Sequence, residues 1–279
     1  MPWFAKQDRG DGGANEPPKR QPPYDSAILG SKFDHLIEHM GAGLGVEHYI
    51  ESLAAKQTLF EDLIGGTEAA RLDQDACMAM FEHMFTARRK FAGPFMNMAL
   101  EERQGLLKAL LDEDTESLER IRAFAEAAPT GGDRKIKRAA WDFAAECLHF
   151  RAPERCPLMT RWIWDTATEA GALRELIRGS DGLREVPLGG DTGTYEQARD
   201  WIADQLAERG YYREIPFLID LTLAQAYSDY MQAMSFNAGM VTGELGAKAD
   251  PLEFVVKLLG IEPARRGGRS RVRRNPKGH

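Results

Sequence analysis

Residues 139–179 read AAWDFAAECLHFRAPERCPLMTRWIWDTATEAGALRELIRG, the densest run of large apolar side chains in the chain. The run holds three of the five tryptophans and two of the three cysteines. Because aromatic side chains bury more area than others, we expect this run to form the centre of a hydrophobic core. Trp141, and at least one of Trp162 and Trp164, should be buried.

Helical periodicity extends outward from this run in both directions. Apolar residues recur three and four positions apart, and no segment alternates apolar and polar residues in the manner of a strand. The sequence therefore predicts an all-α protein, a bundle-like orthogonal or up-down assembly of about 8–10 helices. The expected helices cover 26–40, 46–64, 73–91, a segment opened by Pro94, one capped by Asp114 or Thr115, one capped by Asp133, 167–179, a segment with a Thr194–Gln197 capping box, a long segment from Pro216, and a short one opened by Asp250–Pro251.

Two alternatives remain open between these helices. The short apolar run 158–165 fits either a helix start or an extended piece, because periodicity does not separate the two at this length. The polar loop 179–193 either separates a smaller lobe from the N-terminal bundle or is an excursion from one domain. The predicted divisions are a disordered leader 1–24, a helical bundle 25–178, a helical lobe 179–262 that could share its domain, and a flexible basic tail 263–279.

Composition limits the classes of protein that the chain fits. It has 279 residues, of which 43% are hydrophobic and 28% charged, as in ordinary globular proteins. It contains no run of about 18 apolar residues, so we expect no membrane span. The start, MPWFAKQDRGDGG, lacks the pattern of a secretory signal, and three cysteines do not pair evenly. A cytoplasmic location with reduced thiols is the simplest expectation.

The charge is unevenly distributed along the chain. The net charge is −7, and residues 263–279 contain six arginines, one lysine and no acid, so residues 1–262 carry −7 − 7 = −14. Such a tail is suited to an acidic protein surface, a nucleic acid or an anionic membrane, although it lacks the aromatic residues that stack on single strands. A purely solubilising end is the alternative. The candidate polyanion-binding residues are Arg265, Arg266, Arg269, Arg271, Arg273, Arg274 and Lys277.

Glu146 and His149 form the most compact pair of metal-ligand types. At positions i and i+3 of a helix the two side chains project in the same direction, as in bundle proteins that bind two metal ions. The sequence has no second Glu-x-x-His, and the nearest substitutes are His35, Glu38 and His39. We expect no cofactor, with a metal ion as the open possibility.

A second candidate site is the cluster of Arg161, Trp162, Trp164 and Asp165. It could line a ligand pocket in which Arg161 binds a carboxylate or phosphate, or it could be core with an internal ion pair. Cys147 and Cys156 are better explained as buried structural residues than as nucleophiles, since their spacing fits neither a redox pair nor a zinc hairpin.

The function that these features favour is a cytoplasmic accessory or adaptor protein. It would dock onto a partner protein through an apolar face and use the basic tail as an electrostatic tether. The main alternative is a metal-dependent helical-bundle enzyme built around Glu146 and His149, and a direct nucleic-acid binder is the third. The non-enzymatic alternative is preferred by elimination, because no complete catalytic constellation is visible and the body is too acidic for a duplex-binding face.

Overall fold

The computed structural model describes residues 23–66, 72–237 and 250–262, and within them the protein is all-α as predicted. Beyond helices, the described residues contain a single isolated bridge between Asp165 and Ala170. The ten α-helices, within the predicted number, are α1 Ser26–Ala42, α2 Val46–Ile64, α3 Gln74–Glu82, α4 Phe85–Met96, α5 Leu100–Leu110, α6 Ser117–Ala127, α7 Arg134–Arg151, α8 Thr192–Glu208, α9 Ile215–Asn237 and α10 Pro251–Leu258.

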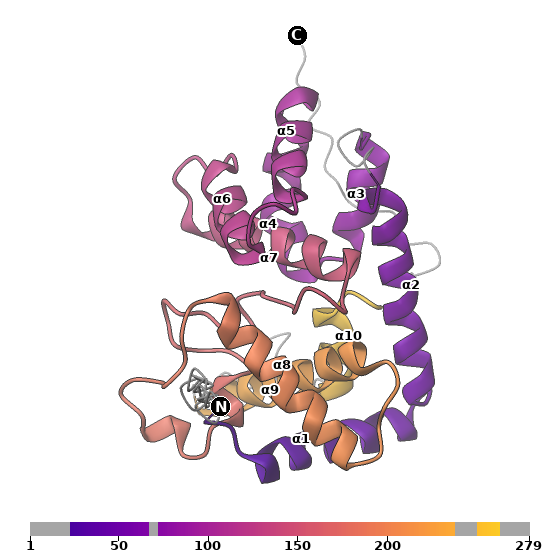
Figure 1. Ribbon diagram of the computed structural model, residues 1–279, viewed down its shortest axis with the longest axis vertical. Helices are drawn as coiled ribbons and strands as arrows, with labels where there is room; N and C mark the ends of the chain where they lie inside the picture. Colours follow the sequence, from indigo (N-terminus) through magenta and orange to yellow (C-terminus); the bar gives the residue numbers. More distant parts are fainter. Residues whose placement is uncertain (1–22, 67–71, 238–249, 263–279) are drawn as a thin grey trace, which may run out of the picture.

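Helix α7 is the centre of the molecule, as its composition predicts. Every residue from Asp142 to Phe150 is buried. The helix packs against α4 and α6 on one side and against α2 on another (Figure 1). Trp162 and Trp164 are buried as predicted, whereas Trp141, also predicted to be buried, is only partly buried against the core. The aromatic density of 139–179 therefore marks the core.

The remaining helices lie in two groups beside α7 (Figure 1). Helices α3 to α6 form the upper group in the view, and α1, α8, α9 and α10 form the lower one. Helix α9 contacts α1, α8 and α10, while the long α2 runs along both groups and contacts both α7 and α9. Helix α9 is buried over much of its length, which agrees with the wide apolar surface of its sequence.

Helix starts follow the local capping signals in several cases. The side chains of Asp25, Asp133 and Asp250 each accept hydrogen bonds from backbone N–H groups in the first turn of their helices. The predicted capping box of α8 is wrong, because Asp191 is the cap and accepts hydrogen bonds from both the backbone N and the Oγ1 of Thr194. The expected caps of α6 are also wrong, since that helix starts at Ser117 without a side-chain cap.

The expected helix 73–91 is divided into α3 and α4, which meet at His83 and Met84. A residue from far along the chain, Gly260, lies against this break. Nδ1 of His83 lies 3.0 Å from the carbonyl oxygen of Gly260, and a Cβ on Gly260 would lie 1.9 Å from the carbonyl oxygen of His83. Gly260 also has a φ of 67°, so only glycine fits this approach without strain. Pro94 lies in the last turn of α4, where it does not open the next helix.

The segment 167–179, predicted as a helix, is mostly irregular. It contains one short 3₁₀ turn, Arg174–Leu176, and it folds back on the preceding residues. The backbone N–H groups of Ala172 and Leu173 donate to the carbonyl oxygens of Trp162 and Ile163. Gly171 has a φ of 135° and approaches the Ile163 carbonyl so closely that a Cβ would lie 2.5 Å from its oxygen. This pairing fixes the loop that carries Arg161 and Asp165.

The ends of the chain are only partly described. Tyr24, which the prediction assigns to the leader, packs its ring 5.1 Å from the ring of Trp201. The rest of the predicted leader except Pro23, and all of the basic tail, lie outside the described residues. The division at residue 178 stays a prediction. Among the described residues no helix has the length and apolar character needed to cross a membrane.

Candidate functional site

The predicted cluster of Arg161, Trp162, Trp164 and Asp165 is organised around the Arg161 guanidinium. Its Nη2 donates to Asp142 Oδ2 at 3.0 Å and its Nη1 to Asp165 Oδ2 at 3.4 Å. Its Nε donates to the carbonyl oxygen of Arg138 at 3.2 Å, and the Arg161 backbone N–H donates to Asp142 Oδ1 at 2.9 Å. The internal ion pair that the sequence allowed is therefore present, together with a second one to Asp142.

The same cluster also lines a cavity of about 470 Å³, which we call the basic pocket. Arg161, Trp164 and Asp165 contribute to it, and Trp162 lines a different cavity. The volume lies within the range of small-ligand sites, roughly 300–1,000 Å³. The cluster thus contains the internal ion pair and also borders a cavity, and ligand binding there stays a prediction.

The basic pocket is strongly cationic. Among its lining residues the ionisable ones, Tyr195 aside, are five basic residues and one acid, Asp165. The five are Arg122 on α6, Arg134, Lys137 and Arg138 on α7, and Arg161 on the loop. Their formal charges and that of Asp165 sum to +4, so the pocket favours a negatively charged occupant.

Most of this positive charge is poorly compensated. Arg122 and Arg134 form no ion pair with another described residue, and Arg138 reaches Asp165 only at 3.9 Å. Lys137 pairs with Glu126. Arg161 has five N–H donors and uses three in its side-chain hydrogen bonds, which leaves two. Donors for an anion are therefore available at the pocket.

The aromatic part of the basic pocket comes from Trp141, Trp164 and Tyr195. Each polar group of these rings is already bound to the protein. The indole N–H of Trp141 donates to the Met159 carbonyl and that of Trp164 to the Gly189 carbonyl, while the Tyr195 hydroxyl donates to the Trp164 carbonyl. Burial raises the pKa of Tyr195. These bonds fix the rings as rigid apolar surfaces beside the cations.

Glu146 and His149 lie on a buried polar stripe of α7 whose third member is Asp142. The three residues are spaced i, i+4 and i+7, so they lie on one face of the helix. Lys56 Nζ on α2 donates to Glu146 Oε2 at 2.8 Å and to the carbonyl oxygen of Leu259 at 2.8 Å. Thr86 on α4 donates to Glu146 Oε1 at 3.2 Å. Each member of the stripe thus binds a different part of the fold.

Burial dominates the ionisation of this stripe. It raises the pKa of Glu146 and of Asp142, and in both cases the paired cation opposes the shift. It lowers the pKa of Lys56, which also lies 3.8 Å from the centre of the Phe150 ring. Desolvation of both charges is the cost of keeping such a pair inside a protein.

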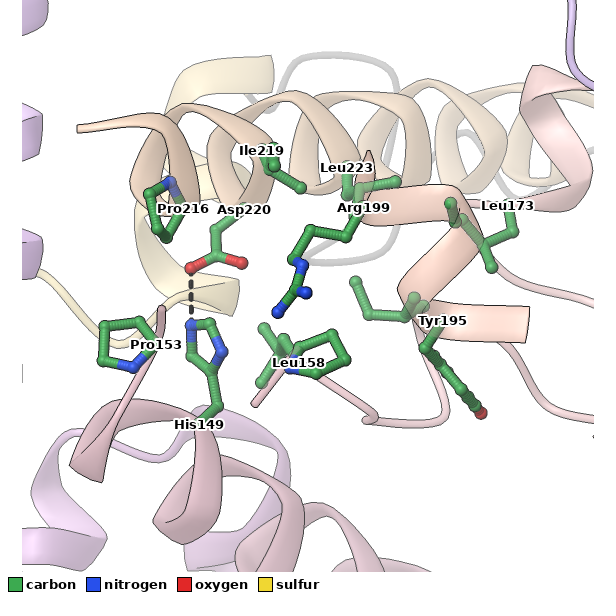
Figure 2. A pocket seen from close by; sticks show the side chains of 13 residues that line it. His149, Pro153, Leu158, Leu173, Tyr195, Arg199, Pro216, Ile219, Asp220 and Leu223 are labelled. Atoms are coloured by element: carbon green, nitrogen blue, oxygen red, sulfur yellow. Dashed lines mark hydrogen bonds and ion pairs between the residues drawn. The ribbon is translucent and has the colours of Figure 1, made fainter. Parts of the chain in front are cut away.

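His149 joins α7 to α9 (Figure 2). Its Nε2 lies 2.8 Å from Asp220 Oδ2, and its Nδ1 lies 2.8 Å from the carbonyl oxygen of Cys156. Since a carbonyl oxygen only accepts, Nδ1 carries a proton. The cavity beside the pair, which Arg199 also lines, measures about 20 Å³, enough for one water molecule and too small for an organic ligand.

The predicted metal ligands are not brought together. Glu146 faces Lys56, and His149 faces Asp220, whereas His35 and Glu38 are exposed on α1. His39 lies on α1 with its ring centre 6.4 Å from that of His35. Across residues 23–66, 72–237 and 250–262, no three His, Cys, Asp or Glu side chains group so as to hold a metal ion.

The cysteines behave as the structural interpretation predicts. Cys77, Cys147 and Cys156 are unpaired and buried. Burial is the largest influence on each thiol and raises its pKa. A raised thiol pKa reduces the fraction of reactive thiolate at neutral pH.

Sequence reasoning missed four of the five cations of the basic pocket. Arg134, Lys137 and Arg138 stand in RKIKR, which follows the Asp133 cap, and this local run of four cations in five residues was a usable signal. Arg122, Lys56 and Asp220 gave no such signal, since their importance depends on contacts between distant segments.

Comparison of the chain with protein-family models, with curated proteins and with solved structures found no match to any of them.

Proposed function

We propose that this protein binds a small anionic ligand, carrying a phosphate or carboxylate group, in the basic pocket. The observation that carries the proposal is the excess of positive charge in the lining, five cations against one acid in a cavity of about 470 Å³, with Lys137 paired to Glu126 and Arg161 to Asp142. Two free N–H groups of Arg161 and the unpaired Arg122 and Arg134 supply charge-assisted hydrogen bonds, which are the stronger kind.

The aromatic residues of the pocket support a ligand with a planar apolar part. Trp141, which is only partly buried, is held by its indole hydrogen bond, so a ring that stacks on it costs little side-chain ordering. Arg161 itself is fixed by Asp142 and Asp165 before any ligand arrives. A preorganised cation of this kind favours bidentate binding of a phosphate or carboxylate.

The test is calorimetric titration of the full chain with 1-naphthyl phosphate, inorganic phosphate and the neutral 1-naphthol. We expect 1-naphthyl phosphate to bind most tightly and to lose affinity as salt is added, because exposed charges are screened. The double variant Arg122→Gln/Arg134→Gln should bind it at least tenfold more weakly, about 1.4 kcal/mol. Both arginines are exposed, so folding should be unaffected.

The matched control is Arg89→Gln/Arg213→Gln. These two arginines are also exposed, and neither lines a described cavity, so this variant should bind like the wild type. Equal affinity for 1-naphthol and 1-naphthyl phosphate, or an equal loss in both double variants, would refute binding through the charges of the basic pocket.

The adaptor hypothesis remains a separate proposal. It is supported by the charge distribution, −14 before residue 263 against +7 after it, and its tail residues lie outside the described part of the chain. Both proposals involve anions, so tail deletion and pocket variants are needed to separate them.

A further inference from the structure

A second large cavity, of about 450 Å³, lies between α4, α9, α10 and the loop that carries Arg161. We call it the aromatic pocket. It shares only Arg161 and Asp165 with the basic pocket and otherwise has different walls. The shared pair therefore faces two spaces of different chemistry.

Five aromatic side chains line the aromatic pocket: Phe85, Trp162, Tyr227, Tyr230 and Phe254. They are grouped around Tyr227, whose ring centre lies 6.0 Å from that of Trp162, 5.9 Å from that of Tyr230 and 6.3 Å from that of Phe254. Ring faces carry negative electrostatic potential, and groups of such rings bind alkylammonium ions.

The ionised groups of the aromatic pocket add to this negative character. Asp142 and Asp165 are its two acids, and Arg161 is its one cation, so the lining carries a formal charge of −1. Arg161 is bound to both carboxylates, at 3.0 Å and 3.4 Å. The charge of Arg161 is thereby offset, and Asp165 also lies 3.9 Å from Arg138 of the basic pocket, so the carboxylate charge beside the rings is partly compensated.

We propose that the aromatic pocket binds an organic cation, an alkylated ammonium group. The rings supply cation–π contacts, and the two carboxylates of the lining, Asp142 and Asp165, add negative charge near them. An anion is disfavoured here, because the pocket offers aromatic faces and a net negative charge. A neutral apolar ligand would gain affinity only from contact with the rings, and it would offer no positive charge to the carboxylates of the lining.

The first experiment uses the full chain and two probes of nearly the same shape. Choline carries a quaternary ammonium, and 3,3-dimethyl-1-butanol replaces its nitrogen with carbon. We expect choline to bind at least tenfold more tightly in calorimetric titration. Equal binding of the two probes, or binding of neither, overturns the proposal, and no variant is needed for this comparison.

Two variants test whether choline binds in the aromatic pocket. Tyr230→Leu removes one ring that is only partly buried, and it should weaken choline binding while leaving 1-naphthyl phosphate binding unchanged. Tyr212→Leu, at a tyrosine that is 75% exposed and lines no described cavity, is the control and should bind choline normally. Choline binding that is unaffected by Tyr230→Leu would place the cation elsewhere and overturn the assignment.

Asp165 lines both pockets, so the substitution Asp165→Asn removes one negative charge from the lining of each. Choline binding should fall and 1-naphthyl phosphate binding should rise, two changes of opposite sign from one substitution. The amide oxygen keeps an acceptor for the Ala167 N–H, which limits disturbance of the loop. The proposal for the basic pocket fails separately, if the phosphate probe does not bind while choline does.

Discussion

Asp142 shows how one buried carboxylate links the stability of the core to the geometry of the pockets. It is 2% exposed, and both of its oxygens accept hydrogen bonds from Arg161. Arg161 in turn is one of the two residues that both large cavities share, the other being Asp165. The orientation of the guanidinium toward either cavity therefore depends on a carboxylate that belongs to α7.

The raised pKa of Asp142 gives a prediction with a definite sign. Burial raises this pKa from the usual 3.8, so between 3.8 and the folded-state pKa the folded protein binds more protons than the unfolded chain. Stability from this group is thus greatest at low pH and is lost as the pH rises through that window. The Asp142→Asn variant has no ionisable group at this position, so its stability should not fall with pH in this way.

Urea unfolding of both proteins between about pH 4 and pH 7 checks the sign. The stability deficit of Asp142→Asn relative to the wild type should shrink as the pH rises. A deficit that grows with pH would show that the attraction of Arg161 outweighs desolvation, and that the pKa of Asp142 is lowered in the folded protein.

At the scale of elements, the Lys56–Glu146 pair joins α2 to α7 and, through the Leu259 carbonyl, to the end of α10. Both side chains are nearly inaccessible, at 2% and 3% exposure. Removing one partner leaves the other charge buried and unpaired, which costs about 3–5 kcal/mol. Lys56→Met and Glu146→Leu should each destabilise the protein by that amount.

The double variant Lys56→Met/Glu146→Leu should be far less destabilised than the sum of the two single variants. Replacing a buried pair with apolar side chains avoids the desolvation of both charges. A double-mutant cycle measured by urea unfolding gives the coupling between the two side chains. Additive effects would mean that Lys56 and Glu146 contribute through their packing alone.

The elements also show where sequence reasoning succeeds and where it ends. The starts of α7 and α10 are predictable, because Asp133 and Asp250 cap backbone groups within three residues of themselves. The break at His83 lies against Gly260, and the irregular segment 167–179 pairs with Trp162 and Ile163. Local periodicity contains no information on contacts of either kind.

The candidate site follows the same rule. Its quartet Arg161, Trp162, Trp164 and Asp165 is predictable as a cluster, because neighbours in sequence stay neighbours in space. That Trp164 and Trp162 would line different cavities is not predictable, because the other walls come from α6, α7 and α8 in one case and from α4, α7, α9 and α10 in the other. The buried partners of the α7 stripe are also distant in sequence, and Glu146 lies 90 positions after Lys56.

At the scale of the whole molecule, the acidic chain carries two separate groups of basic residues, the basic pocket and the basic tail. The basic pocket is built by folding, whereas the basic tail is a property of sequence alone. If the tail acts as a tether, its effect is electrostatic and roughly additive over Arg265, Arg266, Arg269, Arg271, Arg273, Arg274 and Lys277. Each exposed charge contributes up to about 1 kcal/mol, so no single substitution should abolish binding.

Deletion of residues 264–279 separates the two sources. The deleted segment contains one large apolar residue, Val272, so the free energy of unfolding should not change. Binding of 1-naphthyl phosphate should also persist, because the pocket is made by α6, α7 and the Arg161 loop. Association with poly-L-glutamate, a model acidic surface, should slow at low salt, and the difference should vanish as the Debye length falls below about 8 Å. The double variant Arg122→Gln/Arg134→Gln should show the reverse pattern, with phosphate binding weakened and association with poly-L-glutamate nearly normal.

If the deletion leaves the association rate with poly-L-glutamate unchanged at low salt, the tether hypothesis is refuted. A drop in the free energy of unfolding would show that the segment contributes to the stability of the folded domain. Electrostatic attraction between the tail and the acidic body would be the source, and this contribution should weaken as salt is added.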